Sequence, residues 1–272
     1  MADLATQLIV FTDLDGSLLD HDTYSWEAAS AWLSRLKRLQ IPIVITTSKT
    51  AAEVTPLQQM LGLSDMPFIA ENGALVSLPG WSSHADYPRK IFNADYPQIC
   101  RLLHNLRDKQ RFAFRGFSDM SDEEVADVTG LDLAGAALAR CREASEPIQW
   151  RGDAVSLAAF RLCLRQHQLE LTQGGRFYHV MGCGISKGNA VNWLKIQYEG
   201  QQQKKWVAIG LGDGPNDVSM LQACRYAVVI KGQASQNVQL PDDFNGEQFW
   251  TGASGPAGWS EGLNYFLREL II

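Results

Sequence analysis

The stretch LIVFTDLDGS, residues 8–17, decides the fold. It begins with four consecutive apolar residues, which are typical of a short strand buried on both faces, as in a parallel sheet covered by helices. An Asp-x-Asp-Gly turn follows directly. A second apolar run, WVAI at residues 206–209, leads in the same way into an aspartate-rich turn at residues 212–217. Because ligands of open parallel sheets bind beyond the carboxyl ends of the strands, we expect aspartates from these two distant segments to meet in one pocket.

Four aspartates of these turns would then lie side by side: Asp13, Asp15, Asp213 and Asp217. Their charges repel one another, so the arrangement calls for a hard divalent cation with oxygen ligands, and Mg2+ is the usual one. Asp-x-Asp-Gly alone is also typical of turns and helix N-caps, which would give these residues a purely local role. Asn216 and Asp217 in particular stand where a helix N-cap is expected. Further polar motifs, which occur in a fixed order along the chain, favour a shared site over this local role.

Strands and helices alternate at both ends of the chain, as the spacing of their apolar residues indicates. This alternation predicts an α/β fold with a doubly wound parallel sheet, to which both ends of the chain contribute. The predicted elements are helix 26–39, strand 41–45, helix 51–61 and strand 67–70 in the first part, and helix 187–198, strand 206–211, helix 218–224, strand 226–230 and helix 260–270 in the last part.

The middle of the chain follows a different pattern, in which helices and strands are not regularly alternated. Ser121 to Glu124 fits a capping box at a helix start, and two strand-like runs flank Gly174-Gly175. We therefore predict a discontinuous core of residues 1–83 and 181–272, with an α+β cap domain of residues 84–180 inserted into it. Cap and core together would enclose the strand ends.

Composition narrows the classes of function. The chain has 272 residues, 46% of them hydrophobic, a net charge of -6 and a pI near 5.4, which argues against nucleic acid or a membrane surface as partner and for a small-molecule ligand. No stretch reaches membrane-spanning length and no leader is evident, so we expect a cytoplasmic protein. The five cysteines and five histidines show no metal-binding spacing, which leaves oxygen atoms as the expected metal ligands. The oligomeric state stays open.

Four motifs in order resemble those of the haloacid dehalogenase superfamily of phosphotransferases: DLDG at 13–16, TTSK at 46–49, Lys187-Gly188, and the turn at 212–217. The resemblance implies that Asp13 attacks a phosphomonoester to form an aspartyl-phosphate. It also implies that Asp15 protonates the leaving alcohol and then deprotonates the hydrolytic water. Mg2+ would be held by Asp13, the Asp15 backbone carbonyl and Asp213, with Asp217 as a further or water-mediated ligand.

The same resemblance implies a set of groups that bind the phosphoryl oxygens. These are the Thr47 hydroxyl, backbone N–H groups near Ser48 and Gly16, and the ammonium of Lys187. Two alternatives stay open. A lone lysine at a helix start is usually solvated, because a helix N-terminus disfavours cations. Thr47 and Ser48 are adjacent hydroxyls, so either one could be the phosphate ligand. At Ser17, where relatives commonly carry threonine, the hydroxyl is kept.

Three further stretches, at 68–74, 130–147 and 174–180, together with the tail GPAGW at 255–259, are similar to mannosyl-3-phosphoglycerate phosphatases. That resemblance implies a type 2 cap and a product, mannosylglycerate, released from a substrate with a phosphate, a carboxylate and a sugar. The residues it places on the substrate are Glu71, Asn72, Gly73, Gly175, Arg176 and Asn216. Arg176 would pair with the carboxylate through two parallel hydrogen bonds. On the alternative interpretation Gly174-Gly175 is a hairpin turn, Arg176 a surface cation and His179 a structural histidine.

Other functions stay open beside this one. A phosphatase of broader sugar-phosphate range would use the same residues, and a mutase would share the aspartyl-phosphate. A non-catalytic sensor of phosphorylated sugars on the same fold is a different class of protein, and the presence of both Asp13 and Asp15 argues against it. A nucleotide-binding dehydrogenase is disfavoured because no strand is followed by Gly-x-Gly-x-x-Gly.

Overall fold

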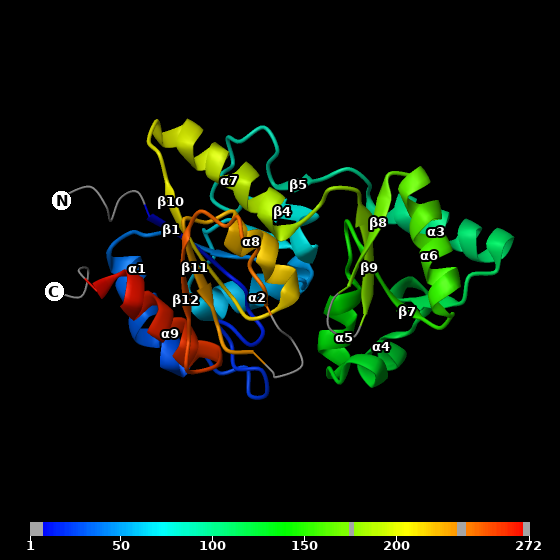
Figure 1. Ribbon diagram of the computed structural model, residues 1–272, viewed down its shortest axis with the longest axis horizontal. Coiled ribbons are helices and arrows are strands. Elements are labelled where there is room, and N and C mark those ends of the chain that lie inside the picture. Colours follow the sequence, from blue (N-terminus) through cyan, green and yellow to red (C-terminus); the bar gives the residue numbers. More distant parts are fainter. Residues whose placement is uncertain (1–7, 174–176, 233–237, 269–272) are drawn as a thin grey trace. The chain divides into compact units, whose positions relative to one another are not determined.

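A five-stranded parallel sheet forms the centre of the computed structural model, which describes residues 8–173, 177–232 and 238–268 (Figure 1). The strand order is β12-β11-β10-β1-β2, and every neighbouring pair is parallel. In chain order the strands are β1 (Leu8–Thr12), β2 (Ile43–Ile45), β10 (Val207–Gly212), β11 (Tyr226–Val229) and β12 (Glu247–Trp250). All residues of β1 and β2 are buried, as expected for strands covered on both faces.

Helices cover both faces of this sheet. The helices α1 (Ser30–Arg38) and α9 (Gly255–Phe266) lie together on one face, where the indole N–H of Trp32 donates to the side-chain oxygen of Asn264 at 2.9 Å (Figure 1). On the other face α8 (Val218–Gln222) packs against β10 and β11, and α7 (Lys187–Gln202) packs on α8. The predicted α/β class with a doubly wound parallel core is therefore confirmed.

The strand order places a topological switch point between β1 and its two neighbours. From β1 the chain moves to β2 on one side, while β10, β11 and β12 follow on the other side. The carboxyl ends of β1 and β10 lie in register, with Thr12 opposite Leu211. Ligands of open α/β sheets bind at such a point, so the fold directs attention to the residues after Thr12 and after Gly212.

Two differences from the predicted elements have local causes. The strand β12 was not predicted, because its residues EQFW contain no apolar run and are mostly exposed at the edge of the sheet. The helix α9 begins at Gly255, five residues before the predicted start at Ser260. Pro256 lies in its first turn, where the missing N–H costs nothing, and the proline therefore starts this helix.

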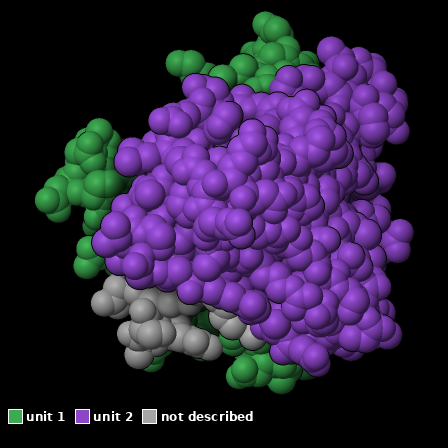
Figure 2. All heavy atoms as spheres, turned by 90° about the vertical axis from the view of Figure 1, so that its right-hand side faces the viewer, with its two compact units in different colours: residues 1–47, 66–69, 186–272 green, residues 48–65, 70–185 purple. Residues whose placement is uncertain are grey.

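The chain divides into two compact units, which Figure 2 shows in different colours. Unit 1 comprises Met1–Thr47, Met66–Ile69 and Ser186–Ile272, and contains the parallel sheet; unit 2 comprises Ser48–Asp65 and Ala70–Ile185. Unit 2 thus includes residues 48–65 and 70–83, which the sequence assigns to the core. The predicted domain boundaries, 1–83 with 181–272 and 84–180, stay a prediction.

Unit 2 is built on a four-stranded antiparallel sheet of order β6-β7-β9-β8. Helices α3 and α6 pack on this sheet through a core that includes Phe114, Phe160 and Leu164. The elements of the sheet and of these helices are α3 (Tyr96–Gln110), β6 (Phe114–Gly116), β7 (Glu146–Trp150), α6 (Ala154–Gln166), β8 (Leu169–Gln173) and β9 (Tyr178–Gly182).

The rest of unit 2 consists of helices and short strands outside this sheet. Ser121 and Glu124 form the capping box that the sequence predicts, at the start of α4. The elements are α2 (Ala51–Leu61), β3 (Phe68–Ala70), which crosses the boundary between the units, β4 (Leu75–Ser77), β5 (Arg89–Ile91), α4 (Asp122–Thr129) and α5 (Leu133–Arg140). In the part of the chain that the structure describes, no helix is both long and apolar enough to cross a membrane.

Candidate active site

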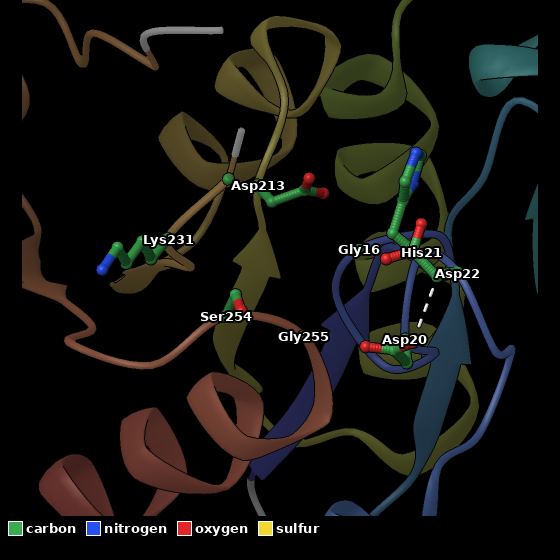
Figure 3. A pocket seen from close by; sticks show the side chains of 9 residues that line it. Gly16, Asp20, His21, Asp22, Asp213, Lys231, Ser254 and Gly255 are labelled. Carbon is green, nitrogen blue, oxygen red and sulfur yellow. Dashed lines mark hydrogen bonds between the residues drawn. The ribbon is translucent and has the colours of Figure 1, made fainter. Parts of the chain in front are cut away.

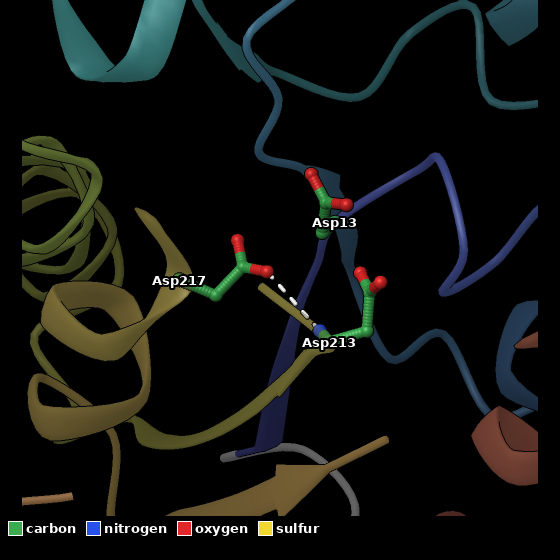
Figure 4. Close-up of side chains that lie close together, drawn as sticks. All are labelled: Asp13, Asp213 and Asp217. Atoms are coloured by element: carbon green, nitrogen blue, oxygen red, sulfur yellow. Dashed lines mark hydrogen bonds between the residues drawn. The ribbon is translucent and has the colours of Figure 1, made fainter. Parts of the chain in front are cut away.

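Three of the predicted aspartates meet at the carboxyl ends of β1 and β10 (Figure 4). Asp13 follows β1, and its backbone N–H donates to the Leu211 carbonyl at 2.9 Å, which ties it to the neighbouring strand. Asp213 and Asp217 lie on the turn after β10. One carboxylate oxygen of each aspartate lies within 4.8 Å of the others. The fold therefore brings side chains from residue 13 and residue 213 into one cluster, all of it within unit 1.

Lys187 is bound directly to this cluster. Its ammonium donates to Asp13 Oδ1 at 2.7 Å and to Asp217 Oδ1 at 2.6 Å, and its side chain is fully buried. The residue is the first of α7, where the helix dipole alone would disfavour a cation. The two carboxylates overcome this effect, so the alternative of a solvated lysine does not describe this structure.

Asp217 is held more firmly than the other two aspartates. Its Oδ2 accepts hydrogen bonds from the backbone N–H groups of Asp213 at 3.1 Å and Gly214 at 2.9 Å, while Oδ1 accepts from Lys187. The residue is fully buried. Both of its oxygens are thus used in fixing the turn after β10 and the ammonium. Asp13 and Asp213 point toward the space beside it (Figure 4).

Burial and mutual repulsion raise the pKa values of this cluster. For Asp13, burial is the largest cause, and although Lys187 lowers the pKa, the charges of Asp217, Asp213 and Asp15 raise it further. Burial and the charge of Asp217 raise the pKa of Asp213 to about 6. Burial alone would lower the pKa of Lys187, but the carboxylates of Asp13 and Asp217 outweigh it and raise that pKa. The site therefore carries more negative charge than its lysine balances.

The turn after Asp13 fits closely against Asp213. Gly16 has a φ of +79°, and a Cβ atom at this position would lie 2.6 Å from Asp213 Oδ2, so glycine is required for both reasons. The Gly16 N–H donates to the Leu19 carbonyl at 2.9 Å and closes the turn that carries Asp15. The Ser17 hydroxyl donates to Asp213 Oδ1 at 3.1 Å. Gly16 and Ser17 thereby place the first motif against the last one.

The two predicted phosphate-binding hydroxyls follow β2. Thr47 is 1% exposed and its backbone N–H donates to the Ile69 carbonyl at 2.9 Å, while Thr46 N–H donates to the Thr12 carbonyl at 2.7 Å. These bonds set the second motif beside β1, the strand that Asp13 follows. Ser48 is the first residue of unit 2, and its carbonyl accepts hydrogen bonds from the guanidinium of Arg142.

The predicted substrate residues lie in different places. Glu71, Asn72 and Gly73 follow β3 in unit 2 and are buried. Both oxygens of the Glu71 carboxylate accept bonds from protein donors at residues 143–145, so direct contact with a substrate would require those bonds to break. Asn216 is half-buried on the turn between Asp213 and Asp217. Gly175 and Arg176 lie outside the described residues.

A cavity of about 210 Å³ opens beside the aspartate cluster in unit 1 (Figure 3). Loops after three of the parallel strands line it, as does the start of α9. The lining residues are Gly16, Asp20, His21, Asp22, Asp213, Lys231, Gly232, Ser254 and Gly255. The Lys231 side chain extends away from the Asp213 carboxylate in this view. The cavity therefore gives Asp213 access from outside.

Two residues that support Asp13 were not predicted as site residues. The Thr12 hydroxyl donates to the backbone carbonyl of Asp13 at 2.7 Å, and it accepts from the indole N–H of Trp259 at 2.9 Å. Trp259 is fully buried in α9. The sequence contains the tail motif around Trp259, but no spacing rule connects it with a residue 247 positions earlier.

The fold and this cluster agree with a comparison against protein families. Residues 10–122 and 164–242, more than half of the chain, match the family of haloacid dehalogenase-like hydrolases. The chain belongs to this family. The superfamily that its four motifs resemble is thereby confirmed, and the protein is a hydrolase by family.

Solved structures with the same fold cover almost the whole chain. The protein 0175 of Thermoplasma acidophilum is 20% identical, with a TM-score of 0.66 over 97% of this chain and 99% of that one. The subclass IIB sugar phosphatase BT4131 is 17% identical, with a TM-score of 0.66 over 97% and 100%. The sucrose-phosphatase of Synechocystis sp. PCC6803, solved with sucrose and phosphate, is 15% identical, with a TM-score of 0.62 over 96% and 98%. At these identities the likeness concerns the fold.

Proposed function

We propose that the protein is a Mg2+-dependent phosphomonoester hydrolase that works through an aspartyl-phosphate on Asp13. One observation carries the proposal: Asp13, Asp213 and Asp217 cluster at the switch point of the sheet, and the ammonium of Lys187 binds two of them, Asp13 and Asp217. Family membership supports hydrolysis as the reaction class. An acidic cluster of this kind suits a cation and a phosphoryl group together, because the cation removes the repulsion between two anions.

The donor set fits Mg2+. Oxygen atoms are the ligands that this ion prefers, and Asp13 and Asp213 offer carboxylates that protein donors do not saturate as they do Asp217. We assign Asp13, Asp213 and the Asp15 carbonyl as direct ligands and Asp217 as a further or water-mediated one. When bound, the ion would supply positive charge to the phosphoryl oxygens and favour the ionised form of Asp13.

The protein's own residues account for the remaining steps. The Asp13 carboxylate attacks phosphorus, and Asp15, two residues along the same turn, gives a proton to the departing alcohol oxygen. Water then attacks the phosphorus of the aspartyl-phosphate after losing a proton to Asp15, which restores Asp13 and releases inorganic phosphate. Lys187, the Thr47–Ser48 turn and backbone N–H groups near Gly16 hold the phosphoryl oxygens, while the Gly16 N–H itself donates to the Leu19 carbonyl.

For the substrate we propose mannosyl-3-phosphoglycerate, which would be converted to mannosylglycerate. The support is the likeness of stretches 68–74, 130–147 and 174–180 to phosphatases of that compound, together with the sugar phosphatases among the structural neighbours. The proposed contacts with the substrate are Asn72, Gly73, Gly175, Arg176 and Asn216, and Arg176 binds the substrate carboxylate. Glu71 is the remaining residue of the predicted set. In this proposal residues 84–180 form a cap that closes over the substrate and excludes bulk water.

A phosphate-release screen tests both levels of the proposal. Mannosyl-3-phosphoglycerate, glucosyl-3-phosphoglycerate, sucrose-6-phosphate and common hexose phosphates are offered with Mg2+ or with EDTA, and Asp13→Asn serves as the inactive control. We expect release that needs Mg2+, is lost in Asp13→Asn and is at least about 10-fold faster in kcat/KM for the glycerate ester than for hexose phosphates, an advantage of about 1.4 kcal/mol.

Other outcomes would select the alternatives. Equal rates on hexose phosphates would indicate a sugar-phosphate phosphatase of broad range. Return of labelled phosphate to a sugar hydroxyl would indicate a mutase. Tight binding of phosphosugars by the wild type without any release of phosphate would indicate a sensor and end the proposal of hydrolysis.

A further inference from the structure

A buried ion pair in unit 2, between Arg142 and Glu71, contacts the backbone of the turn that would bind phosphate. The Arg142 guanidinium lies 3.5 Å from Glu71 Oε2, and the two side chains are 3% and 0% exposed. Glu71 also accepts from the backbone N–H groups of Glu143 at 2.7 Å and Ala144 at 3.2 Å, and from the Ser145 hydroxyl at 2.7 Å. The Glu71 carboxylate therefore fixes the whole loop of residues 142–145.

Arg142 in turn holds the backbone after the second motif. Its two terminal nitrogens donate to the Ser48 carbonyl at 3.3 and 3.4 Å, and one of them also donates to the Ser145 hydroxyl at 2.9 Å. Its Nε contacts Glu71 and the Ser145 carbonyl. With its donors engaged in this way and its side chain buried, Arg142 is suited to hold protein groups in place more than to bind a substrate.

The next residues of the turn are held by the same segment. The backbone N–H of Glu71 donates to the Lys49 carbonyl at 2.9 Å, and the Thr50 hydroxyl donates to the Leu138 carbonyl at 2.9 Å. A peptide group is planar, so a carbonyl held on one side fixes the direction of the N–H on the other side. The orientation of the Ser48 and Lys49 peptides thus depends on Arg142 and Glu71.

Backbone strain at Glu71 supports a specific role for this pair. Glu71, Asn72 and Gly73 have φ values of +51°, +57° and +98°, and the first two are not glycine. Left-handed conformations cost a residue with a side chain roughly 1 kcal/mol or more, and they persist where surrounding contacts determine them. The bonds to Glu71 supply those contacts.

We propose that Arg142 is a positioning residue of the phosphoryl-binding turn, and that Glu71 holds Arg142 for this purpose. The inference rests on the proposed phosphatase function. Arg142 lies just after α5, in a segment that the sequence assigns to the cap. Through Arg142, this segment sets the orientation of the Thr47–Ser48 turn. Arg142 acts through the Ser48 carbonyl and does not touch the substrate.

Binding of inorganic phosphate in the presence of Mg2+ tests the proposal, because phosphate is the product and requires no knowledge of the sugar. We compare Arg142→Lys with Arg140→Lys, a matched control two residues away whose guanidinium makes a partly exposed ion pair with Asp122. For Arg142→Lys we expect phosphate Kd to rise about 10-fold and kcat to fall by a similar factor, since it loses charged hydrogen bonds to one carbonyl. Arg140→Lys should match the wild type.

A second variant separates positioning from folding. Arg142→Met/Glu71→Gln removes both members of the buried ion pair together, which costs less than leaving one of them alone, and circular dichroism checks before each titration that the variant is folded. We expect it to show the same loss of phosphate affinity. Wild-type phosphate affinity in the folded double variant would overturn the inference and leave the phosphatase proposal intact. If the wild type released phosphate from no ester at all, both would fall, and the screen above would show it.

Discussion

Two buried clusters of charge in this protein differ in their balance. In unit 1, the carboxylates of Asp13, Asp213 and Asp217 face the ammonium of Lys187, which leaves two negative charges among these four groups. In unit 2, one carboxylate faces one guanidinium, and backbone N–H groups and a hydroxyl complete the carboxylate's bonds. The second cluster is satisfied by the protein alone, whereas the first one is not.

This difference separates a cluster that needs a ligand from one that holds the fold. A buried charge without a partner is costly, so an unbalanced cluster persists only if a ligand compensates it or if the rest of the fold tolerates the cost. The same cost favours the neutral form of Asp13 and Asp213 and so raises their pKa values. Removal of a single negative charge should therefore stabilise unit 1 and destabilise unit 2 when no divalent cation is present.

Removal of the Lys187 ammonium from the aspartate cluster of unit 1, the unbalanced cluster, should have the largest effect. In Lys187→Met, Asp13 and Asp217 face each other without a counterion, so we expect kcat to fall by about 1,000-fold and the free energy of unfolding in EDTA to fall by about 3 to 5 kcal/mol. Mg2+ should restore part of the stability and little of the rate. Lys195→Met on the same helix is the control for both measurements. A variant as stable as wild type in EDTA would contradict the charge balance that we assign to unit 1.

The balanced cluster should respond to the loss of its carboxylate. Glu71→Gln removes the ion-pair partner of the buried Arg142 and replaces an acceptor with an amide that cannot serve all the donors, so we expect a loss of about 3 kcal/mol in the free energy of unfolding. Mg2+ should not change this loss. Glu143→Gln, which breaks a partly exposed ion pair with Arg89, should cost less than about 1 kcal/mol in the same denaturant titration.

The sequence predicted the unbalanced cluster well for a physical reason. Each aspartate follows a buried apolar run, and the carboxyl ends of parallel strands necessarily meet at one edge of the sheet. The order of the motifs then indicated Lys187, although a lysine at a helix start is usually solvated. The predicted helix 51–61 and the capping box at Ser121 also agree with the structure, because their signals are local.

The balanced cluster was beyond reach of the same reasoning. Arg142 and Ser48 are 94 positions apart, and neither hydrophobic period nor turn chemistry links them. Glu71 was expected to contact the substrate, because the resemblance identifies the stretch but not the direction in which its carboxylate points. The strand β12 was missed for a related reason, since an exposed edge strand carries no apolar period.

Neutralising one carboxylate of the unbalanced cluster should stabilise the metal-free protein. Asp213→Asn removes a charge whose pKa is raised to about 6, and the new side chain still accepts from Ser17, so at pH 8 in EDTA we expect a gain of about 1 to 2 kcal/mol in the free energy of unfolding. The wild type should gain further stability with rising Mg2+, and the variant should gain little. Destabilisation in EDTA, or an equal response to Mg2+, would contradict the excess of negative charge.

The last expected effect, similar in size to that of Asp213→Asn, concerns pH and has opposite signs in the two units. His179 in β9 is buried beside Arg142, and burial together with that cation lowers its pKa to about 3. The unfolded chain takes up a proton near pH 6.5, so unit 2 loses stability as the pH falls from 6.5 toward 3. Asp213 acts in the reverse sense, since its folded pKa is about 6 and its protonation relieves repulsion as the pH falls toward 3.8.

In EDTA these two contributions partly cancel in the wild type, and a variant can separate them. His179→Asn should remove a loss of about 1 to 2 kcal/mol between pH 7 and pH 5, so its free energy of unfolding should fall less over this range than that of the wild type. His167→Asn, an exposed position at the end of α6, is the control and should follow the wild type. Parallel pH profiles for wild type and His179→Asn would show that His179 takes up its proton over the same pH range in the folded and unfolded protein, against the lowered pKa. The loss of folding stability at acid pH would then come from groups other than Glu71, Arg142 and His179.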